Sequence, residues 1–265
     1  MSYERELAFA KETAKAAGDM ILRGFSVATT ATWKADNTPL TETDTAINDM
    51  VIGNVRAAFP ADGVLGEEAS FGAKRDRLWV VDPLDGTQAF DVGAPLATFC
   101  LALVENGKVV LGVVYDPFED RMYSAMYGQG AFLNEQPLHV SDANSLAQNY
   151  AVLSSRSLTS YKATGELYDA IVEHGGKPFS FRSVVYGYMR VAAGKAVVAV
   201  AGYLQPWDYA AAKVILEEAG ATITNFAGEY CEYDQVGGGI VVSNGRVHQQ
   251  VLELISDKGH ENTGD

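Results

Sequence analysis

The sequence predicts an α/β protein in which helices and strands form packed layers. Residues 4–58 carry apolar side chains mostly at helical spacing, and residues 78–115 contain short apolar runs that are typical of strands. Residues 150–255 alternate between the two kinds of segment. Alternating helices and strands pack as layers around shared sheets, so these observations together favour this fold class.

Two helices are predicted at the start of the chain. The first spans about the first 25 residues, where apolar side chains recur at helical spacing through a charged segment; they are Leu7, Ala10, Ala14, Ala17 and Ile21. The second runs from about Thr45 to Ala58, with Pro60 just beyond its end. A polar stretch, 33–43, separates the two helices.

The middle of the chain is predicted to be rich in strands. Apolar runs occupy 78–81, 98–104 and 109–115, and the turn sequence Glu-Asn-Gly-Lys at 105–108 joins the last two as a hairpin.

The later half mixes both element types. Its predicted strands are 150–153, 196–200 and 240–242, and its predicted helices are 209–219 and 246–255. The polar tail, 256–265, is expected to fray. The polar sequence at 141–145 suggests a division into an α+β subdomain, 1–141, and an α/β subdomain, 142–265.

Composition excludes several classes of protein. A formal charge of −14 leaves no excess of Lys and Arg for nucleic acid or an anionic membrane surface. Cys100 and Cys231 form no CxxC pair, which argues against a disulfide framework or a thiolate zinc site. The N-terminus is studded with charges, and no apolar run reaches the roughly 18 residues of a transmembrane helix. A cytoplasmic protein is therefore expected.

The segment Asp-Pro-Leu-Asp-Gly-Thr at 82–87 is the most informative part of the sequence. An apolar strand enters a turn in which Pro83 fixes one φ angle and Gly86 permits close backbone approach. Asp82 and Asp85 would then emerge together as hard oxygen ligands suited to Mg²⁺. The same sequence is also a good turn in its own right, so both interpretations stay open on this segment alone.

Two further acidic segments have two interpretations each. Glu67 and Glu68 follow an apolar pair and are either surface charges or carboxylates bridged by a cation. Asp208, in Pro-Trp-Asp-Tyr-Ala-Ala-Ala at 206–212, is either a helix N-cap or a metal ligand.

Taken together, Gly-Glu-Glu, Asp-Pro-Leu-Asp-Gly-Thr and Pro-Trp-Asp-Tyr-Ala-Ala-Ala resemble the signature of the inositol monophosphatase superfamily. They occur in this order across most of the chain. The resemblance implies a layered αβαβα sandwich of the inositol monophosphatase and fructose-1,6-bisphosphatase type. It also implies a homodimer, with two or three Mg²⁺ ions per subunit that Mn²⁺ can replace, and inhibition by Li⁺.

The resemblance also assigns roles to particular residues. Glu67, Asp82 and the Leu84 carbonyl would hold one Mg²⁺, and Asp82, Asp85 and Asp208 a second. Gly86 and Thr87 would begin the segment whose backbone N–H groups face the phosphate. The Thr87 hydroxyl would pair with Asp44 to orient the attacking water, with Glu68 assisting and Lys34 adding positive charge.

The implied activity is Mg²⁺-dependent hydrolysis of a small phosphate ester, either inositol-phosphate-like or a sugar phosphate. A metal-activated water attacks phosphorus directly, and no phosphoenzyme forms.

Three positions depart from true inositol phosphatases. Ala201 stands where relatives carry a Glu that bonds inositol hydroxyls, seven residues before the metal-binding Asp. Arg182 lies in a segment that aligns with a substrate-contacting stretch, and it is either a donor to a second phosphate or carboxylate or a paired surface residue. Gln88 replaces a Thr after Asp-Pro-Leu-Asp-Gly-Thr, a site where histidinol-phosphate relatives often carry Arg.

These departures leave alternatives open. They are a histidinol-phosphate phosphatase, or a phosphatase of a bisphosphate such as fructose 1,6-bisphosphate or 3'-phosphoadenosine 5'-phosphate. A non-catalytic metal-binding protein is a further reading, because a fold alone does not fix function. The sequence contains no GxSxG, GxxxxGK[ST], GxGxxG or HExxH motif that would favour another enzyme class.

Overall fold

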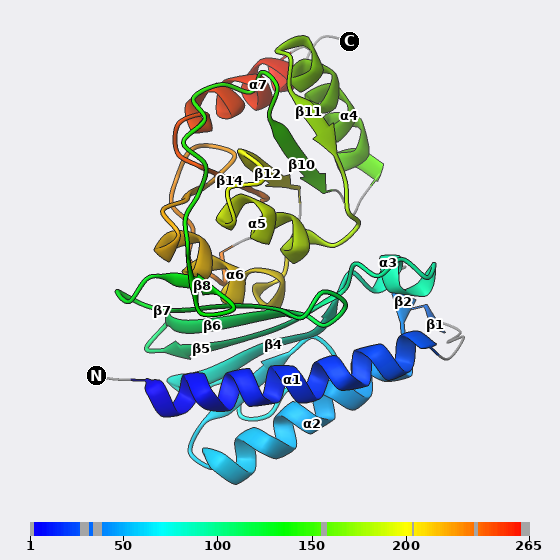
Figure 1. Ribbon diagram of the computed structural model, residues 1–265, viewed down its shortest axis with the longest axis vertical. Helices are drawn as coiled ribbons and strands as arrows, with labels where there is room; N and C mark the ends of the chain where they lie inside the picture. The colour runs from blue at the N-terminus through cyan, green and yellow to red at the C-terminus, as the bar shows by residue number, and fades with distance from the viewer. Residues whose placement is uncertain are drawn as a thin grey trace.

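The computed structural model describes residues 3–26, 32–33, 39–154, 158–202, 204–235 and 238–260. They form five layers, in which two sheets alternate with three layers of helices (Figure 1). The predicted α/β class and the αβαβα sandwich are confirmed.

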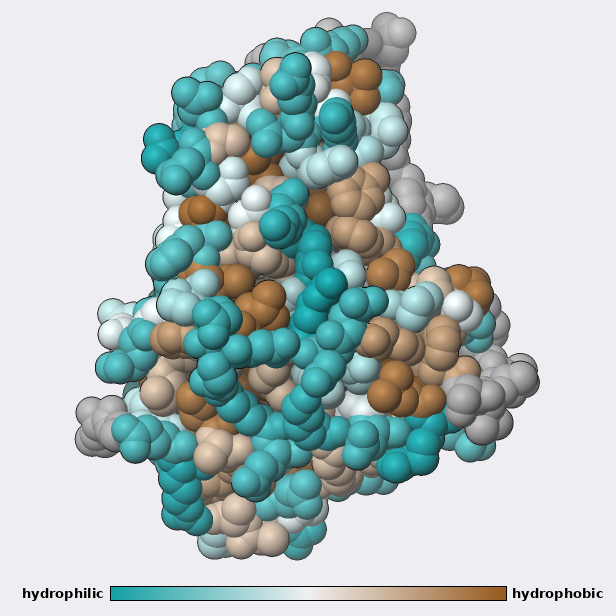
Figure 2. Space-filling view, viewed as in Figure 1, coloured by the Kyte–Doolittle hydropathy of each residue, from teal (hydrophilic) through white to brown (hydrophobic). Residues whose placement is uncertain are grey.

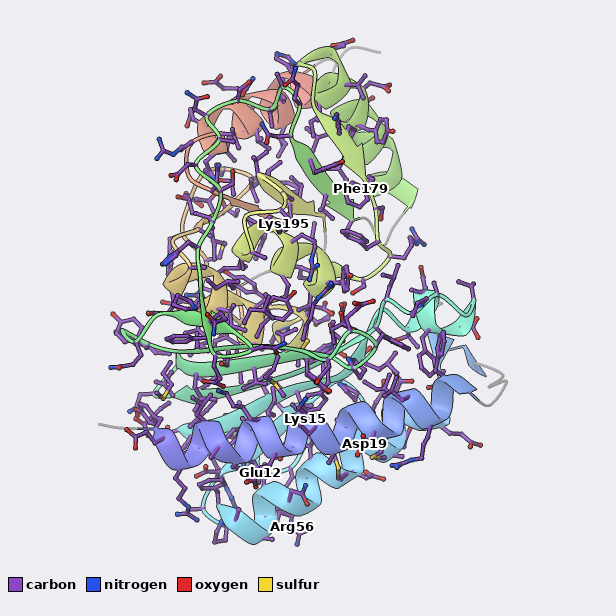
Figure 3. The ribbon with its side chains drawn as sticks, viewed as in Figure 1. Glu12, Lys15, Asp19, Arg56, Phe179 and Lys195 are labelled. Carbon is purple, nitrogen blue, oxygen red and sulfur yellow. The ribbon has the colours of Figure 1, made fainter. Side chains whose placement is uncertain are left out.

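The first helical layer covers one face of the larger sheet. Helices α1 (Glu4–Ser26) and α2 (Glu42–Ala58) pack against strands β3 to β6. The faces of α1 and α2 that meet the sheet are apolar, whereas Glu12, Lys15 and Asp19 lie on the exposed side of α1 (Figure 3). The larger sheet is seven-stranded in the order β3-β4-β5-β6-β7-β8-β9, and only β3 and β4 pair in parallel. Its strands are β3 (Gly63–Gly66), β4 (Arg77–Asp85), β5 (Thr98–Glu105), β6 (Lys108–Asp116), β7 (Arg121–Met126), β8 (Ala131–Leu133) and β9 (Gln136–Leu138).

The central layer holds α5 (Val184–Ala192) and α6 (Pro206–Glu218). Helix α6 crosses β4 to β7 on the face opposite α1 and α2, and α5 contacts both α6 and the smaller sheet. A continuous apolar core joins the two sheets through these helices.

The smaller sheet is five-stranded in the order β11-β10-β12-β14-β13. Its strands are β10 (Tyr150–Ser154), β11 (Lys177–Phe179), β12 (Val198–Ala201), β13 (Thr222–Asn225) and β14 (Ile240–Ser243). Helices α4 (Leu158–Glu173) and α7 (His248–His260) form the last layer. Short elements complete the chain: β1 (Thr32–Trp33), β2 (Pro39–Leu40) and α3 (Thr87–Asp91).

The predicted elements occur where expected, but some boundaries differ. Helix α2 begins at Glu42, before the predicted Thr45, because Thr41 and Asp44 form a capping box. Helix α7 continues to His260, so residues 256–260 of the expected frayed tail are helical. Residues 261–265 lie outside the described part. The subdomain division at 141 stays a prediction. Helix α6, from the later half, packs on the sheet of the earlier half.

No helix among the described residues is long and apolar enough to span a bilayer. The face in Figure 2 is largely hydrophilic, with smaller hydrophobic areas between.

The contact between β6 and α6 depends on Gly112. A Cβ added there would lie 2.5 Å from the Ala211 carbonyl oxygen and 2.8 Å from Val214 Cγ1. We expect Gly112→Ala to lower the free energy of unfolding by about 1–3 kcal/mol, because backbone and core must shift. Gly53→Ala is the control: Gly53 lies exposed on α2 with no atom within 4 Å of an added Cβ, so this change should stabilise by about 0.5–1 kcal/mol. Urea unfolding measures both, and equal effects would contradict the packing argument.

Candidate active site

Three buried carboxylates meet at one end of the larger sheet. Asp82, Asp85 and Asp208 each place a carboxylate oxygen within 4.8 Å of the others, and none of the three residues is more than 3% exposed. Two belong to β4 and the third to α6, which packs over that strand. The two acidic segments, whose nearest members Asp85 and Asp208 are 123 positions apart in the sequence, are therefore joined by the packing of α6 on the sheet.

An irregularity in β4 brings Asp82 and Asp85 to the same side. Residues three apart in a regular strand point to opposite faces. Here Asp82 pairs with Cys100 and Asp85 with Thr98, so a step of three residues on β4 matches a step of two on β5. This register shift is a β-bulge, which turns Asp85 back toward Asp82.

Asp85 is held by the beginning of helix α5. Both of its carboxylate oxygens accept hydrogen bonds, and burial of the charge is thereby offset. Oδ1 accepts from Val184 N at 3.1 Å. Oδ2 accepts from Val185 N at 3.1 Å, from Thr98 Oγ1 at 3.3 Å and from Ser183 Oγ.

Asp208 occupies the third position of α6 rather than its N-cap. Pro206 starts the helix, the N-cap is Gln205, and the Gln205 backbone N–H donates to Asp208 Oδ2 at 2.7 Å. The interpretation of Asp208 as the N-cap is therefore wrong. Proline suits the first helical position, and this moves the helix start ahead of Asp208.

Asp44 and Thr87 lie beside this cluster. Thr87 Oγ1 is 3.4 Å from Asp44 Oδ1 and donates to the Leu84 carbonyl oxygen at 3.0 Å. The Thr41 backbone N–H donates to Asp44 Oδ2 at 2.9 Å. Burial raises the pKa of Asp44 to about 6 despite the bonds from Thr41, and the charges of Glu67 and Glu68 raise it further. The two glutamates therefore lie close enough to Asp44 for their charges to affect its pKa.

Glu67 and Glu68 follow β3 in a half-buried loop. The Glu67 backbone N–H donates to the Val81 carbonyl oxygen at 3.3 Å, which ties the loop to β4 one residue before Asp82. Asn48 Nδ2, one turn after Asp44 on α2, donates to the Ala69 carbonyl oxygen at 3.1 Å. Hydrogen bonds to β4 and to α2 therefore hold the loop that carries both glutamates.

Arg182 and Gly86 lie at the edge of the cluster. Arg182 has a left-handed φ of 60° and its Nη2 donates to Gln88 Oε1 at 2.5 Å, so its side chain reaches α3. Gly86, the N-cap of α3, has φ 92°, and a Cβ there would lie 2.8 Å from the Leu96 carbonyl oxygen. Glycine is required at this position. Lys34 lies outside the described residues.

Ser183, Thr98 and Asn48 contribute to the site, although the sequence did not point to them. Ser183 could have been found as an N-cap signal, since a serine directly before an apolar helical segment is typical of one. Asn48 carries no such signal, because only the packing of α2 against the 67–70 loop gives it a role.

The donor set fits a hard divalent cation. Asp82, Asp85 and Asp208 offer oxygen atoms only, and three like charges buried this close together repel strongly unless a cation offsets them. Burial raises the pKa of the neighbouring Cys100 thiol, and the charges of the three aspartates raise it further, as expected for concentrated negative charge. Oxygen-only ligands favour Mg²⁺, Mn²⁺ or Ca²⁺ over softer ions.

Comparisons with known proteins find relatives that match almost the whole chain. The family described as the inositol monophosphatase family matches residues 2–260. A fructose-1,6-bisphosphatase/inositol-1-monophosphatase of Thermotoga maritima is 34% identical over 82% of this chain and 82% of its own. A histidinol-phosphatase of Chlorobaculum parvum is 32% identical over 95% of this chain and 97% of its own. The solved structure of an inositol monophosphatase from Thermotoga maritima superposes with a TM-score of 0.90 and 29% identity, over 97% of this chain and 99% of that one.

The raised pKa of Asp44 predicts a pH dependence of stability. The folded protein holds the Asp44 proton more tightly than the unfolded chain, so this contribution is complete below about pH 4 and is lost as the pH rises through about 6. We expect the loss to be about 3 kcal/mol, since one pKa unit corresponds to about 1.4 kcal/mol. Urea unfolding in the presence of a chelator should show it in the wild type and not in Asp44→Asn.

Asp49→Asn is the matched control for this test, because Asp49 lies exposed on the same helix. It should retain the wild-type pH dependence. Parallel pH curves for the wild type and Asp44→Asn would contradict the assignment.

Proposed function

Because this chain belongs to the inositol monophosphatase family, a family of phosphoric monoester hydrolases, we propose that it is a Mg²⁺-dependent phosphatase of a small phosphorylated metabolite. The observation that carries this proposal is the group of three buried carboxylates on β4 and α6, whose oxygen atoms suit a hard divalent cation.

The family resemblance assigns the cation ligands. Glu67, Asp82 and the Leu84 carbonyl would hold one Mg²⁺, and Asp82, Asp85 and Asp208 a second, so that Asp82 is shared. Two or three ions per subunit are proposed, with Mn²⁺ as a substitute. Bound Mg²⁺ supplies Lewis-acid chemistry, which lowers the pKa of water and offsets the charge of phosphoryl oxygens.

The remaining site residues position the reactants. The Thr87 hydroxyl donates its one proton either to the Leu84 carbonyl or, with Asp44 ionised, to Asp44 Oδ1, and in both cases its oxygen can accept a hydrogen bond from the attacking water and orient it. The backbone N–H groups that begin at Gly86 and Thr87 bind the phosphate. Glu68 helps to position water. Lys34, which the structure does not describe, would add positive charge. The water attacks phosphorus in line, without a phosphoenzyme.

The substrate is proposed to be inositol-phosphate-like or a sugar phosphate. Ala201 at the end of β12 is buried and apolar, so it offers no acceptor to a polyol hydroxyl, and this weakens the case for inositol phosphate itself. Arg182 beside Gln88 suits a second anionic group, which keeps bisphosphates such as fructose 1,6-bisphosphate and 3'-phosphoadenosine 5'-phosphate as the second candidate. The histidinol-phosphatase relative keeps histidinol phosphate as another.

The family resemblance supports two further properties as proposals, inhibition by Li⁺ and assembly as a homodimer. Residence in the cytoplasm is proposed as well, and the formal charge of −14 argues against nucleic acid or an anionic membrane surface as a partner.

The test is phosphate release from inositol 1-phosphate, fructose 1,6-bisphosphate, histidinol phosphate, glycerol 2-phosphate and 3'-phosphoadenosine 5'-phosphate, each with and without Mg²⁺. We expect Mg²⁺-dependent release with one preferred substrate. Mg²⁺ binding without release from any of them would favour a non-catalytic metal-binding protein.

Asp85→Asn and Asp208→Asn test the cation ligands. Asparagine keeps the shape but removes the charge, and at position 208 it can still accept the Gln205 hydrogen bond. We expect each change to reduce turnover by about 100-fold or more while the circular dichroism spectrum stays that of the wild type. Near wild-type turnover in either variant, measured at saturating substrate and fixed Mg²⁺, would contradict its role as a ligand.

A further inference from the structure

The hydroxyl of Ser183 forms a directed chain of hydrogen bonds that ends on Asp85. The Tyr186 backbone N–H donates to Ser183 Oγ at 3.3 Å, as expected for an N-cap, and Ser183 Oγ donates to Asp85 Oδ2. A backbone N–H can only donate, and an ionised carboxylate can only accept. The single hydroxyl proton of Ser183 is therefore directed onto Asp85.

This chain is buried and closely packed. Ser183 is 1% exposed and Asp85 is 3% exposed. A Cβ added to Gly86 would lie 2.9 Å from Ser183 Cβ, so the serine backbone lies against the turn that follows Asp85. The position of the hydroxyl relative to the carboxylate is set by two rigid pieces of backbone, the first turn of α5 and the end of β4.

Ser183 acts on one oxygen of Asp85 together with two other donors. Oδ2 accepts from Ser183 Oγ, Val185 N and Thr98 Oγ1, whereas Oδ1 accepts from Val184 N. These hydrogen bonds restrain the rotation of the carboxylate about its last bond. Of these four donors, two are side-chain hydroxyls, on Ser183 and Thr98, that a substitution can remove.

We infer that Ser183 is a positioning residue, which sets the orientation in which Asp85 is presented to Asp82 and Asp208. The inference rests on the proposed function, because it concerns the cation that these three carboxylates would hold. Residues that orient ligands from behind change metal affinity or activity by about 10- to 100-fold when they are removed. Ser183 should therefore set the affinity for Mg²⁺ more than the affinity for substrate.

The experiment is Mg²⁺ titration by isothermal calorimetry of the wild type, Ser183→Ala and Ser183→Thr, with no substrate present. We expect Ser183→Ala to weaken Mg²⁺ binding about tenfold or more, and Ser183→Thr, which keeps the hydroxyl, to restore most of it. In assays, Ser183→Ala should require more Mg²⁺, and its turnover should recover at high Mg²⁺ with KM for the substrate changed less than about threefold. A purely structural role would not shift the Mg²⁺ requirement in this way.

Ser243→Ala is the matched control. Ser243 is a fully buried serine at the end of β14, and its hydroxyl hydrogen-bonds the His248 ring at the start of α7. Its loss therefore tests the general cost of removing a buried hydroxyl. Wild-type Mg²⁺ affinity in Ser183→Ala, or an equal loss in Ser243→Ala, would overturn the inference. If Ser183→Ala does not fold, the comparison is between Ser183→Thr and Ser183→Val, which have the same shape and differ by a hydroxyl in place of a methyl group. Equal Mg²⁺ affinities of these two variants would overturn the inference.

The outcomes separate this inference from the proposed function. A wild type that neither binds Mg²⁺ nor releases phosphate defeats the proposed function. A wild type that does both, beside a Ser183→Ala variant with unchanged Mg²⁺ affinity, defeats the inference alone.

Discussion

The burial of negative charge at one end of the larger sheet is the constraint on which the site depends. Three carboxylates lie within 4.8 Å of one another, and Asp44 and the two glutamates add further charge nearby. A buried carboxylate is costly unless it is hydrogen-bonded, and like charges at this distance add repulsion. Every helix that begins near the site contributes to offsetting this cost.

Four helices begin at this point of the fold. Asp44 and Asp208 occupy the third positions of α2 and α6, where each accepts the backbone N–H of its helix N-cap, Thr41 and Gln205 respectively. Helix α5 begins with the N–H groups that bind Asp85, and α3 begins at Thr87. A helix N-terminus carries partial positive charge, so this arrangement stabilises carboxylates before any cation binds. The proposed Mg²⁺ ions would complete the compensation.

The same geometry links the two sheets. Asp82 and Asp85 come from the larger sheet, whereas α5 and α6 belong to the central layer that joins it to the smaller one. Close packing at Gly112 holds α6 over β6, and the β-bulge turns Asp85 toward α5. Residues far from the acidic cluster can therefore affect cation affinity by shifting a helix start. Ser183, in contrast, lies at the start of α5 and bonds Asp85 directly.

The sequence by itself determined the layered α/β class, most element positions and the acidic motifs, because apolar periodicity and short motifs are local properties. It also pointed to Asp82 and Asp85 as a pair, although Pro83 lies in the bulged end of β4 and not in the predicted turn. The family resemblance implied that Asp208 joins them, and the packing of α6 brings the three together. Tertiary structure alone decided that Asp208 is the third residue of α6 rather than its cap, and that Ser183 bonds Asp85. These contacts connect residues about 100 positions apart, and they depend on how α5 and α6 dock on the sheet, which no local pattern specifies.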